Sequence, residues 1–236
     1  MTSASAAAAP DLRLVVFDMD GTLIDSQHLI VDAMHGAFAR GGQPLPSRED
    51  ILSIVGLSLE EAVVALAPHL PRAEARVLAD HYRDGFVAQR AAGSGAGEAP
   101  LYPGARAALE RLAAEADLLL GIATGKARRG LDHSFEIHGI GGYFTTLQTA
   151  DHHPSKPHPS MLQATLAETG VRAGRAVMVG DTEFDVAMGR AAGFATVGVA
   201  WGYHPRERLA AAGADIVIED FSALDAALAQ LFARTR

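Results

Sequence analysis

Short apolar runs with the character of β-strands recur along the chain, and helical patterns lie between them. The apolar runs cover residues 12–18, 118–124, 143–148, 176–180, 196–200 and 215–218. The helical patterns cover residues 105–116, 127–138, 160–168, 183–192 and 206–212. Buried strands that alternate with helices predict a parallel sheet with helices on both faces. We therefore expect an α/β core with a doubly wound, Rossmann-like sheet, which binds ligands at the carboxyl ends of its strands.

One long segment, residues 26–97, interrupts this alternation because it contains no strand pattern. Apolar residues recur there at helical spacing over 29–38, and a longer helical pattern runs from 72 to about 91. The stretches "SRED" (47–50) and "SLEE" (58–61) have the pattern of capping boxes that open further helices. We predict an all-helical cap domain of residues 26–97, inserted into a core formed by residues 1–25 and 98–236.

Hinges between these two domains are expected near Asp25-Ser26 and in the Gly/Ala-rich linker at 93–100. Residues 1–11 are expected to form a flexible leader, because they lack both the basic region and the apolar stretch of a signal peptide. No run approaches the roughly 20 apolar residues of a membrane span. A cytoplasmic protein, monomeric or homodimeric, is therefore the expectation.

The composition excludes several classes of function. The chain has 236 residues, of which 49% are hydrophobic, and no cysteine, so disulfides, thiolate metal sites and cysteine nucleophiles are excluded. Its formal net charge of −8 and the lack of any Lys/Arg-rich block argue against nucleic acids and anionic membrane surfaces as partners.

The first strand ends in two carboxylates, in "LVVFDMDGTL". Because side chains alternate along a strand, Asp18 and Asp20 are expected to point the same way, roughly 6.5 Å apart at about 3.3 Å per residue. Two like charges at the end of a buried strand are unfavourable unless something positive lies between or beside them. Carboxylates at this spacing suit a hard cation such as Mg²⁺. A pair of aspartates that caps a turn is the alternative interpretation.

Three other strand ends carry residues of the same chemistry. Thr124 and Gly125 follow one strand in "GIATGK", where the glycine N–H can approach an anion at the start of a helix. Lys156, in "SKPHP", directly precedes a helix, and Asp181 and Asp185 follow another strand in "VMVGDTEFD". Each has a structural alternative, namely a helix cap or a surface lysine. Four such strand ends together favour a ligand site, because this fold binds ligands there.

The stretches "DMDGTL", "ATGK", "KPHP" and "GDTEFD", in this order and at this spacing, resemble the four motifs of the haloacid dehalogenase-like hydrolase superfamily. The resemblance extends from residue 12 to the C-terminus. The helical insertion directly after the first motif resembles the helical cap of that superfamily. The stretches "DGTLIDS", "GLSLEEAV" and "LYPGARAALERL" are most similar to its phosphoglycolate-phosphatase-like branch.

The resemblance implies a role for each motif residue. Asp18 would be the nucleophile that forms an aspartyl-phosphate, and Asp20 would be the general acid and base. Thr124 and the Gly125 amide would bind the transferring phosphoryl group. Lys156 would neutralise Asp18 and the phosphate.

The resemblance also implies a Mg²⁺ site. Asp18, the carbonyl oxygen of Asp20 and Asp181 would hold the ion, and Asp185 would support the site. Gly56, in "IVGLS", resembles the loop of the family's cap that approaches the active site and contacts substrate. A simple helix C-cap is the alternative for this glycine.

The expected function is a Mg²⁺-dependent phosphatase that hydrolyses a small phosphorylated metabolite, with phosphoglycolate as the leading substrate by resemblance. Dehalogenation is excluded because those relatives lack an acid at the position of Asp20, and phosphonate cleavage because residues 26–92 contain no lysine. A β-phosphoglucomutase-like sugar-phosphate mutase and a pyrophosphatase stay open as alternatives.

Two alternatives come from other classes of protein. A signalling receiver domain also uses a phosphorylated aspartate, a threonine and a lysine on a parallel sheet. It requires adjacent acids on the first strand, whereas Asp18 and Asp20 are two residues apart. A phosphate-binding protein without turnover is disfavoured because both of these carboxylates are present.

Overall fold

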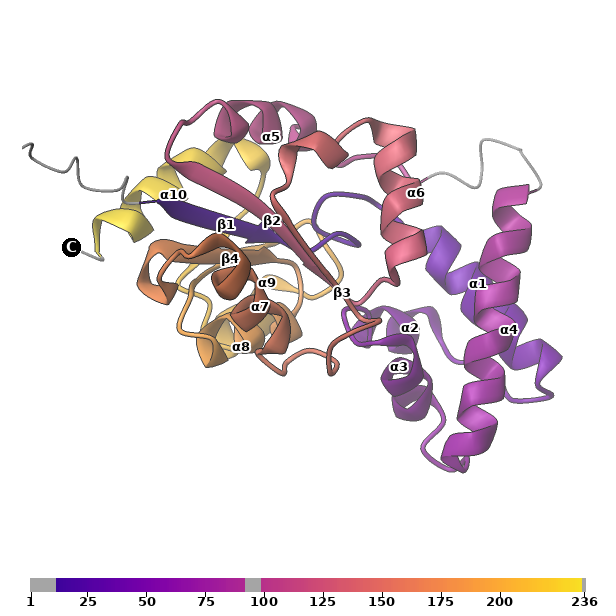
Figure 1. Ribbon diagram of the computed structural model, residues 1–236. Helices are drawn as coiled ribbons and strands as arrows, with labels where there is room; N and C mark the ends of the chain where they lie inside the picture. The colour runs from indigo at the N-terminus through magenta and orange to yellow at the C-terminus, as the bar shows by residue number, and fades with distance from the viewer. Residues whose placement is uncertain (1–11, 92–98, 235–236) are drawn as a thin grey trace, which may run out of the picture.

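A parallel sheet of six strands forms the centre of the computed structural model, which describes residues 12–91 and 99–234 (Figure 1). The strands are β1 (Arg13–Phe17), β2 (Leu118–Thr124), β3 (Thr146–Thr149), β4 (Ala176–Gly180), β5 (Ala195–Val199) and β6 (Ile216–Ile218). Their order across the sheet is β3-β2-β1-β4-β5-β6. The predicted doubly wound α/β fold is confirmed.

The strand order places a topological switch beside β1. The chain runs outward from β1 to β2 and β3 and then returns to β4 on the other side of β1. Phe17, at the end of β1, lies level with Ile122 in β2 and with Val179 in β4. Residues that follow these three strands therefore meet at one point of the sheet edge, which is where ligands bind in open sheets of this kind.

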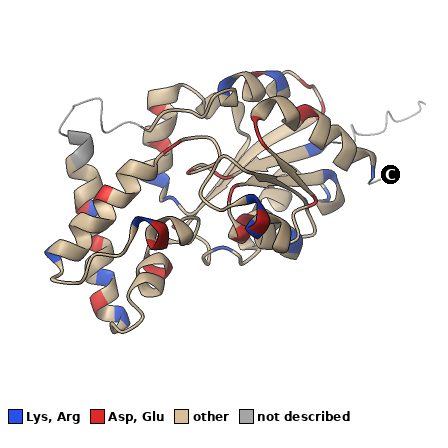
Figure 2. Ribbon diagram, turned by 180° about the vertical axis from the view of Figure 1, so that it is seen from behind, with Lys and Arg blue, Asp and Glu red and all other residues tan. Residues whose placement is uncertain are grey.

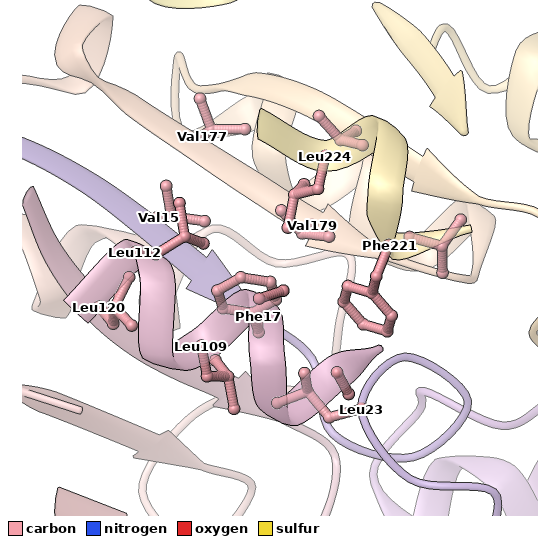
Figure 3. Close-up of a cluster of buried hydrophobic side chains, with 14 of the residues drawn as sticks. Val15, Phe17, Leu23, Leu109, Leu112, Leu120, Val177, Val179, Phe221 and Leu224 are labelled. Atoms are coloured by element: carbon pink, nitrogen blue, oxygen red, sulfur yellow. The ribbon is translucent and has the colours of Figure 1, made fainter. Parts of the chain in front are cut away.

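Helices cover both faces of the sheet. They are α5 (Ala105–Ala113), α6 (Arg128–His138), α7 (Ser160–Thr169), α8 (Glu183–Ala191), α9 (Arg206–Ala211) and α10 (Leu224–Ala233). On one face, Phe17, Leu109 and Leu224 join β1, α5 and α10 in a single buried cluster (Figure 3). On the other face, Met161 of α7 and Met188 of α8 pack on the sheet. The strands are buried on both sides, as their continuous apolar runs predict.

The segment between β1 and β2 is helical, as predicted. It contains α1 (Gln27–Arg40), α2 (Arg48–Ser53), α3 (Leu59–Leu66) and α4 (Arg72–Ala91). These helices have a core of their own, which includes Met34, Phe38 and Leu78. The sheet points its carboxyl edge toward them (Figure 1). The domain boundaries and the two hinges stay predictions, and most of the second hinge lies outside the described residues.

Of the two capping boxes predicted in this segment, one forms only in part and the other does not form. Ser47 does cap α2, because its hydroxyl accepts the N–H of Asp50 at 3.0 Å. Ser58 stands at the N-cap of α3 but makes no side-chain capping bond. Its own N–H instead donates to the Ser155 hydroxyl of the core at 2.8 Å. A contact between the cap and the core has replaced the local bond.

His204 joins the cap to the core in a second place. Its Nδ1 accepts the N–H of Glu183 at 3.1 Å, so Nε2 must carry the proton and donate to the Ser53 carbonyl at 3.0 Å. Burial lowers the pKa of this imidazole, which agrees with a neutral ring. The last turn of α2 is thereby fixed over the start of α8.

Charged positions are interspersed over the cap helices rather than separated into a basic face (Figure 2). Pairs such as Arg40–Asp84 and Arg72–Glu61 lie on their exposed surfaces. No helix among the described residues has both the length and the hydropathy needed to cross a membrane.

Candidate active site

Three adjacent strands deliver three polar side chains to the carboxyl edge of the sheet. Asp18 follows β1, and its N–H donates to the Val179 carbonyl of β4 at 3.0 Å. Thr124 is the last residue of β2, and Asp181 directly follows β4. All three side chains are buried. Their proximity follows from the strand order, because β1 lies between β2 and β4.

Lys156 reaches this edge from the loop between β3 and α7. Its Nζ lies 3.0 Å from Asp18 Oδ1 and 2.6 Å from Asp185 Oδ1. Burial lowers the pKa of the ammonium, but the two carboxylates outweigh this effect and raise it overall. The lysine is therefore charged and fully buried, and the alternative of a surface lysine is wrong.

Asp181 and Asp185 are fixed by hydrogen bonds from both sides of the site. The Thr22 hydroxyl donates to Asp181 Oδ1, and the Tyr203 N–H donates to Oδ2, both at 2.9 Å. Asp185 accepts the N–H and the hydroxyl of Thr182 at 3.1 and 2.7 Å, which completes the capping box of α8. Asp185 thus serves as a helix cap and as a partner of Lys156 at once.

The backbone closes tightly around Asp181. Gly21 has a φ of +86°, and a Cβ added there would lie 2.1 Å from Asp181 Oδ2. A Cβ at Gly202 would lie 2.2 Å from Asp181 Cβ. Side chains at either position would displace the carboxylate, so the glycines are needed for this approach.

The buried carboxylates fit a divalent cation. Oxygens of Asp18, Asp181 and Asp185 all lie within 4.8 Å of one another. Lys156 is the ammonium that contacts this group, so three negative charges face one positive charge and two remain uncompensated. Groups of oxygen ligands whose negative charges outnumber the neighbouring positive charges by two are typical of Mg²⁺ sites.

The pKa values of the acids reflect this deficit. The pKa of Asp18 is raised to about 7, because burial and the charges of Asp185 and Asp20 raise it by more than Lys156 lowers it. Burial and the neighbouring carboxylates also raise the pKa of Asp181 well above its usual range. Without a cation the site therefore retains protons that free carboxylates would lose.

Asp20 belongs to a second, separate ion pair. Its Oδ2 lies 2.9 Å from Lys126 Nζ, and its Oδ1 accepts the Ser26 hydroxyl at 2.6 Å. The same hydroxyl lies 2.9 Å from the Tyr203 hydroxyl. Asp20 is thus held by a cation on one oxygen and a hydroxyl on the other.

Lys126 was not predicted as a site residue, although it stands inside the quoted stretch "GIATGK". The composition of the chain nevertheless contains a signal that singles out Lys126. Of the 20 lysines and arginines only two are lysines, Lys126 and Lys156, and each pairs with one acid of the first motif. Everywhere else the chain uses arginine as its basic residue.

A cavity of about 570 Å³ opens between the cap and this edge of the sheet. Asp18, Asp20 and Thr124 line its floor together with Gly125 and Lys126. The residues predicted at the site are therefore brought together, and their individual roles stay predictions.

The loop between α2 and α3 reaches the same cavity. Gly56 has a φ of +100°, and a Cβ on it would lie 3.0 Å from the Thr182 hydroxyl. A Cβ on Gly125 would lie 2.6 and 2.8 Å from the carbonyl oxygens of Leu57 and Gly56. Gly56 is not the C-cap of α2, which is Ile54. The structure places Gly56 where a cap loop can contact substrate.

Comparison with known proteins identifies the family. The model of the family described as haloacid dehalogenase-like hydrolase matches residues 15–199. The chain is 34% identical to "Probable phosphatase IndB" of Dickeya dadantii over 215 residues, which cover 89% of this chain and 90% of that protein. It is 31% identical to a phosphoglycolate phosphatase of Vibrio parahaemolyticus, with 91% and 95% of the two chains covered.

A solved structure agrees at the level of the fold. The crystal structure of a "predicted phosphatase" from Clostridium acetobutylicum superimposes with a TM-score of 0.82 at 24% identity, over 93% of this chain and 99% of that chain. The chain therefore belongs to the haloacid dehalogenase-like hydrolase family. It is an enzyme of the hydrolase class with phosphoglycolate phosphatases among its relatives, as its motifs predict.

We expect Mg²⁺ to stabilise the protein more strongly as the pH rises. The raised pKa values of Asp18 and Asp181 mean that the metal-free fold takes up protons, so these acids reduce its stability from about pH 4, the pKa of a free Asp, up to about pH 7. Mg²⁺ must displace those protons, so the increase in Tm at a fixed Mg²⁺ concentration should grow between pH 5.5 and 8. Thermal unfolding with and without Mg²⁺ measures it.

Asp181→Asn is the control, because it removes one of the acids and should abolish most of the Mg²⁺-dependent increase. An increase of equal size at pH 5.5 and pH 8 would contradict the assignment of these buried acids as the cation site.

Proposed function

We propose that the protein is a Mg²⁺-dependent phosphatase that hydrolyses a small phosphorylated metabolite through an aspartyl-phosphate on Asp18. The observation that carries this proposal is the separation of the two acids of the first motif into different ion pairs, Asp18 with Lys156 and Asp20 with Lys126. A nucleophile and a general acid need such different surroundings. The names of both relatives support a phosphatase, and that of the Vibrio relative supports the phosphoglycolate-phosphatase-like branch.

In the first step, a carboxylate oxygen of Asp18 forms a bond to phosphorus while the bond from phosphorus to the leaving oxygen breaks. Asp20 donates its proton to that leaving oxygen. Thr124, the Gly125 amide and Lys156 bind the oxygens of the transferring phosphoryl group. In the second step, Asp20 takes a proton from water as the water attacks phosphorus, and Asp18 is released.

Asp18, Asp181 and the carbonyl oxygen of Asp20 would hold Mg²⁺, and Asp185 would support them. When bound, the ion supplies the positive charge that reduces repulsion between the carboxylate nucleophile and the phosphate dianion. Lys156 contributes further positive charge and lowers the pKa of Asp18, which favours the ionised nucleophile.

Lys126 has a positioning role in this mechanism. It contacts the carboxylate of Asp20 directly, and the side chains of both residues are mostly buried. Ser26, at the predicted hinge, holds the other oxygen. The orientation of the general acid is therefore set by one residue of the core and one residue at the entrance to the cap.

The proposal is tested by comparing variants of the two acids on phosphate esters with different leaving groups. Asp18→Asn should form no phosphoenzyme with any ester. Asp20→Asn should lose about 10²–10⁴-fold of its activity on an alkyl phosphate, which needs a proton on its leaving oxygen. With an aryl phosphate it should show a burst of phenol and accumulate a phosphoryl group on Asp18, because the second step lacks its base.

Intact-protein mass spectrometry after an acid quench detects and locates that phosphoryl group. The wild-type protein should release phosphate with Mg²⁺ and stop when a chelator is added. Phosphorylation at any other residue, or undiminished turnover in chelator, would overturn the assigned roles. Pyrophosphate and a sugar 1-phosphate assayed for isomerisation test the pyrophosphatase and mutase alternatives in the same screen.

Lys126→Met should reduce hydrolysis of an alkyl phosphate by about 10–10²-fold and phosphorylation by an aryl phosphate far less, because only the alkyl ester depends on a correctly placed Asp20. In the Asp20→Asn background the same change should have little further effect on the alkyl ester, since the lysine then has no acid to orient. Steady-state rates of the wild type, the two single variants and the double variant complete this double-mutant cycle. Equal losses for both kinds of ester would show that Lys126 acts on the phosphoryl group instead.

A further inference from the structure

The wall of the cavity opposite the strand-end carboxylates is mostly apolar, and Glu60, Glu61 and Arg83 are the charged cap residues on it. It is contributed by α1, α3 and α4 of the cap through the side chains of Ile30, Met34, Leu59, Tyr82, Phe86 and Val87. The side chain of Val87 remains 41% exposed there. Among the described residues, it is one of three large apolar side chains that are exposed to solvent. Apolar side chains left open on a cavity wall are typical of a site that buries an apolar part of its ligand.

Aromatic rings form part of this wall. Tyr82 and Phe86 lie one turn apart on α4, with ring centroids separated by 5.5 Å. The Lys126 ammonium lies 5.6 Å from the centroid of the Phe86 ring, so the apolar wall begins next to the ion pair of Asp20. Aromatic side chains bury a large area when they pack against another ring, and offset-stacked and edge-to-face arrangements of the two rings are favourable.

The cap places little free positive charge on this wall. Arg83 is the cationic cap residue on it, and this arginine already pairs with Asp80 at 2.6 Å and with Glu60 at 4.0 Å. On the core side, Arg129 of α6 also lines the cavity. On the cap side, a second anionic group of a substrate would lie beside apolar side chains and the carboxylates of Glu60 and Glu61, which is unfavourable.

We propose that the substrate is a phosphomonoester whose leaving group is an uncharged body with a ring, which packs against the wall formed by Tyr82, Phe86 and Val87. The inference rests on the proposed phosphatase function and narrows its substrate. The phosphate must lie at the floor, because the strand-end carboxylates, Thr124 and Lys156 are there. The rest of the ester then extends toward the cap. The two-carbon acid of phosphoglycolate would leave this wall uncovered and would bring a carboxylate close to it.

A matched pair of substrates tests the wall directly. Ethyl phosphate and 2-phenylethyl phosphate are both esters of primary alcohols and differ by one phenyl ring. We expect kcat/KM for the phenylethyl ester to be at least about tenfold higher, because its ring is removed from water by the cap wall. Phosphoglycolate, as the third substrate, should also be hydrolysed less efficiently than the phenylethyl ester.

Two substitutions on α4 locate the contact. Val87→Asn should reduce the preference for the phenylethyl ester by about threefold, since it replaces an apolar group on the wall with a polar amide. Val77→Asn is the matched control, because Val77 lies on the same helix, is 51% exposed and does not line the cavity. It should leave the preference unchanged.

The outcomes separate this inference from the function on which it rests. A preference near one, a higher kcat/KM for phosphoglycolate, or an unchanged preference in Val87→Asn would overturn the inference while leaving the phosphatase proposal intact. No Mg²⁺-dependent release of phosphate from any of the three esters would overturn the proposed function itself.

Discussion

The pairing of buried acids with too few buried cations is the constraint on which this structure depends. Asp18 and Asp185 both contact Lys156, Asp181 lies within 4.8 Å of them, and a buried charge left without its partner costs about 3–5 kcal/mol. That is a large fraction of the 5–15 kcal/mol by which a typical domain is stable. Within residues 12–91 and 99–234, such a cluster of buried acids is found at one edge of the sheet, and there the missing charge has a chemical use. A cation that completes the balance also places positive charge where a phosphate must approach a carboxylate.

The topology of the sheet explains why the charges can be brought so close. The acids and the threonine come from the ends of neighbouring strands, and the tight approach of Gly21 and Gly202 to Asp181 leaves little freedom for that carboxylate. The cap adds its own contacts to the same edge, through the Ser58 N–H on Ser155 and through the backbone of Gly56 and Leu57 against Gly125. Ser155 directly precedes Lys156 in the chain, so the loop that contacts the cap is also the loop that delivers the buried ammonium.

The strand ends could be predicted from the sequence because their signal is local. A buried apolar run followed by Asp18, Thr124 or Asp181 determines both the strand and the residue at its end. The pairing of Lys126 with Asp20 and the bond from Ser58 to Ser155 could not, because each joins residues about 100 positions apart. The C-terminal helix α10 was also missed, although its buried residues recur at helical spacing, at positions 224, 227, 228, 231 and 232. Among contacts between distant segments, those expected from the sequence were the ones that the family motifs imply, such as that of Lys156 with Asp18.

The restriction of lysine to two positions has a consequence for the reactivity of the protein. Reagents that acylate or alkylate primary amines find on most proteins a surface covered with lysine side chains, whereas here the arginines offer guanidinium groups that such reagents leave unchanged. Lys156 is enclosed by protein, and the side chain of Lys126, 11% exposed, lines the open cavity. Among side chains, amine chemistry is thereby directed to the residue that holds Asp20. Apart from the N-terminal amine, a reagent regarded elsewhere as unselective would act on this protein as a label for the candidate active site.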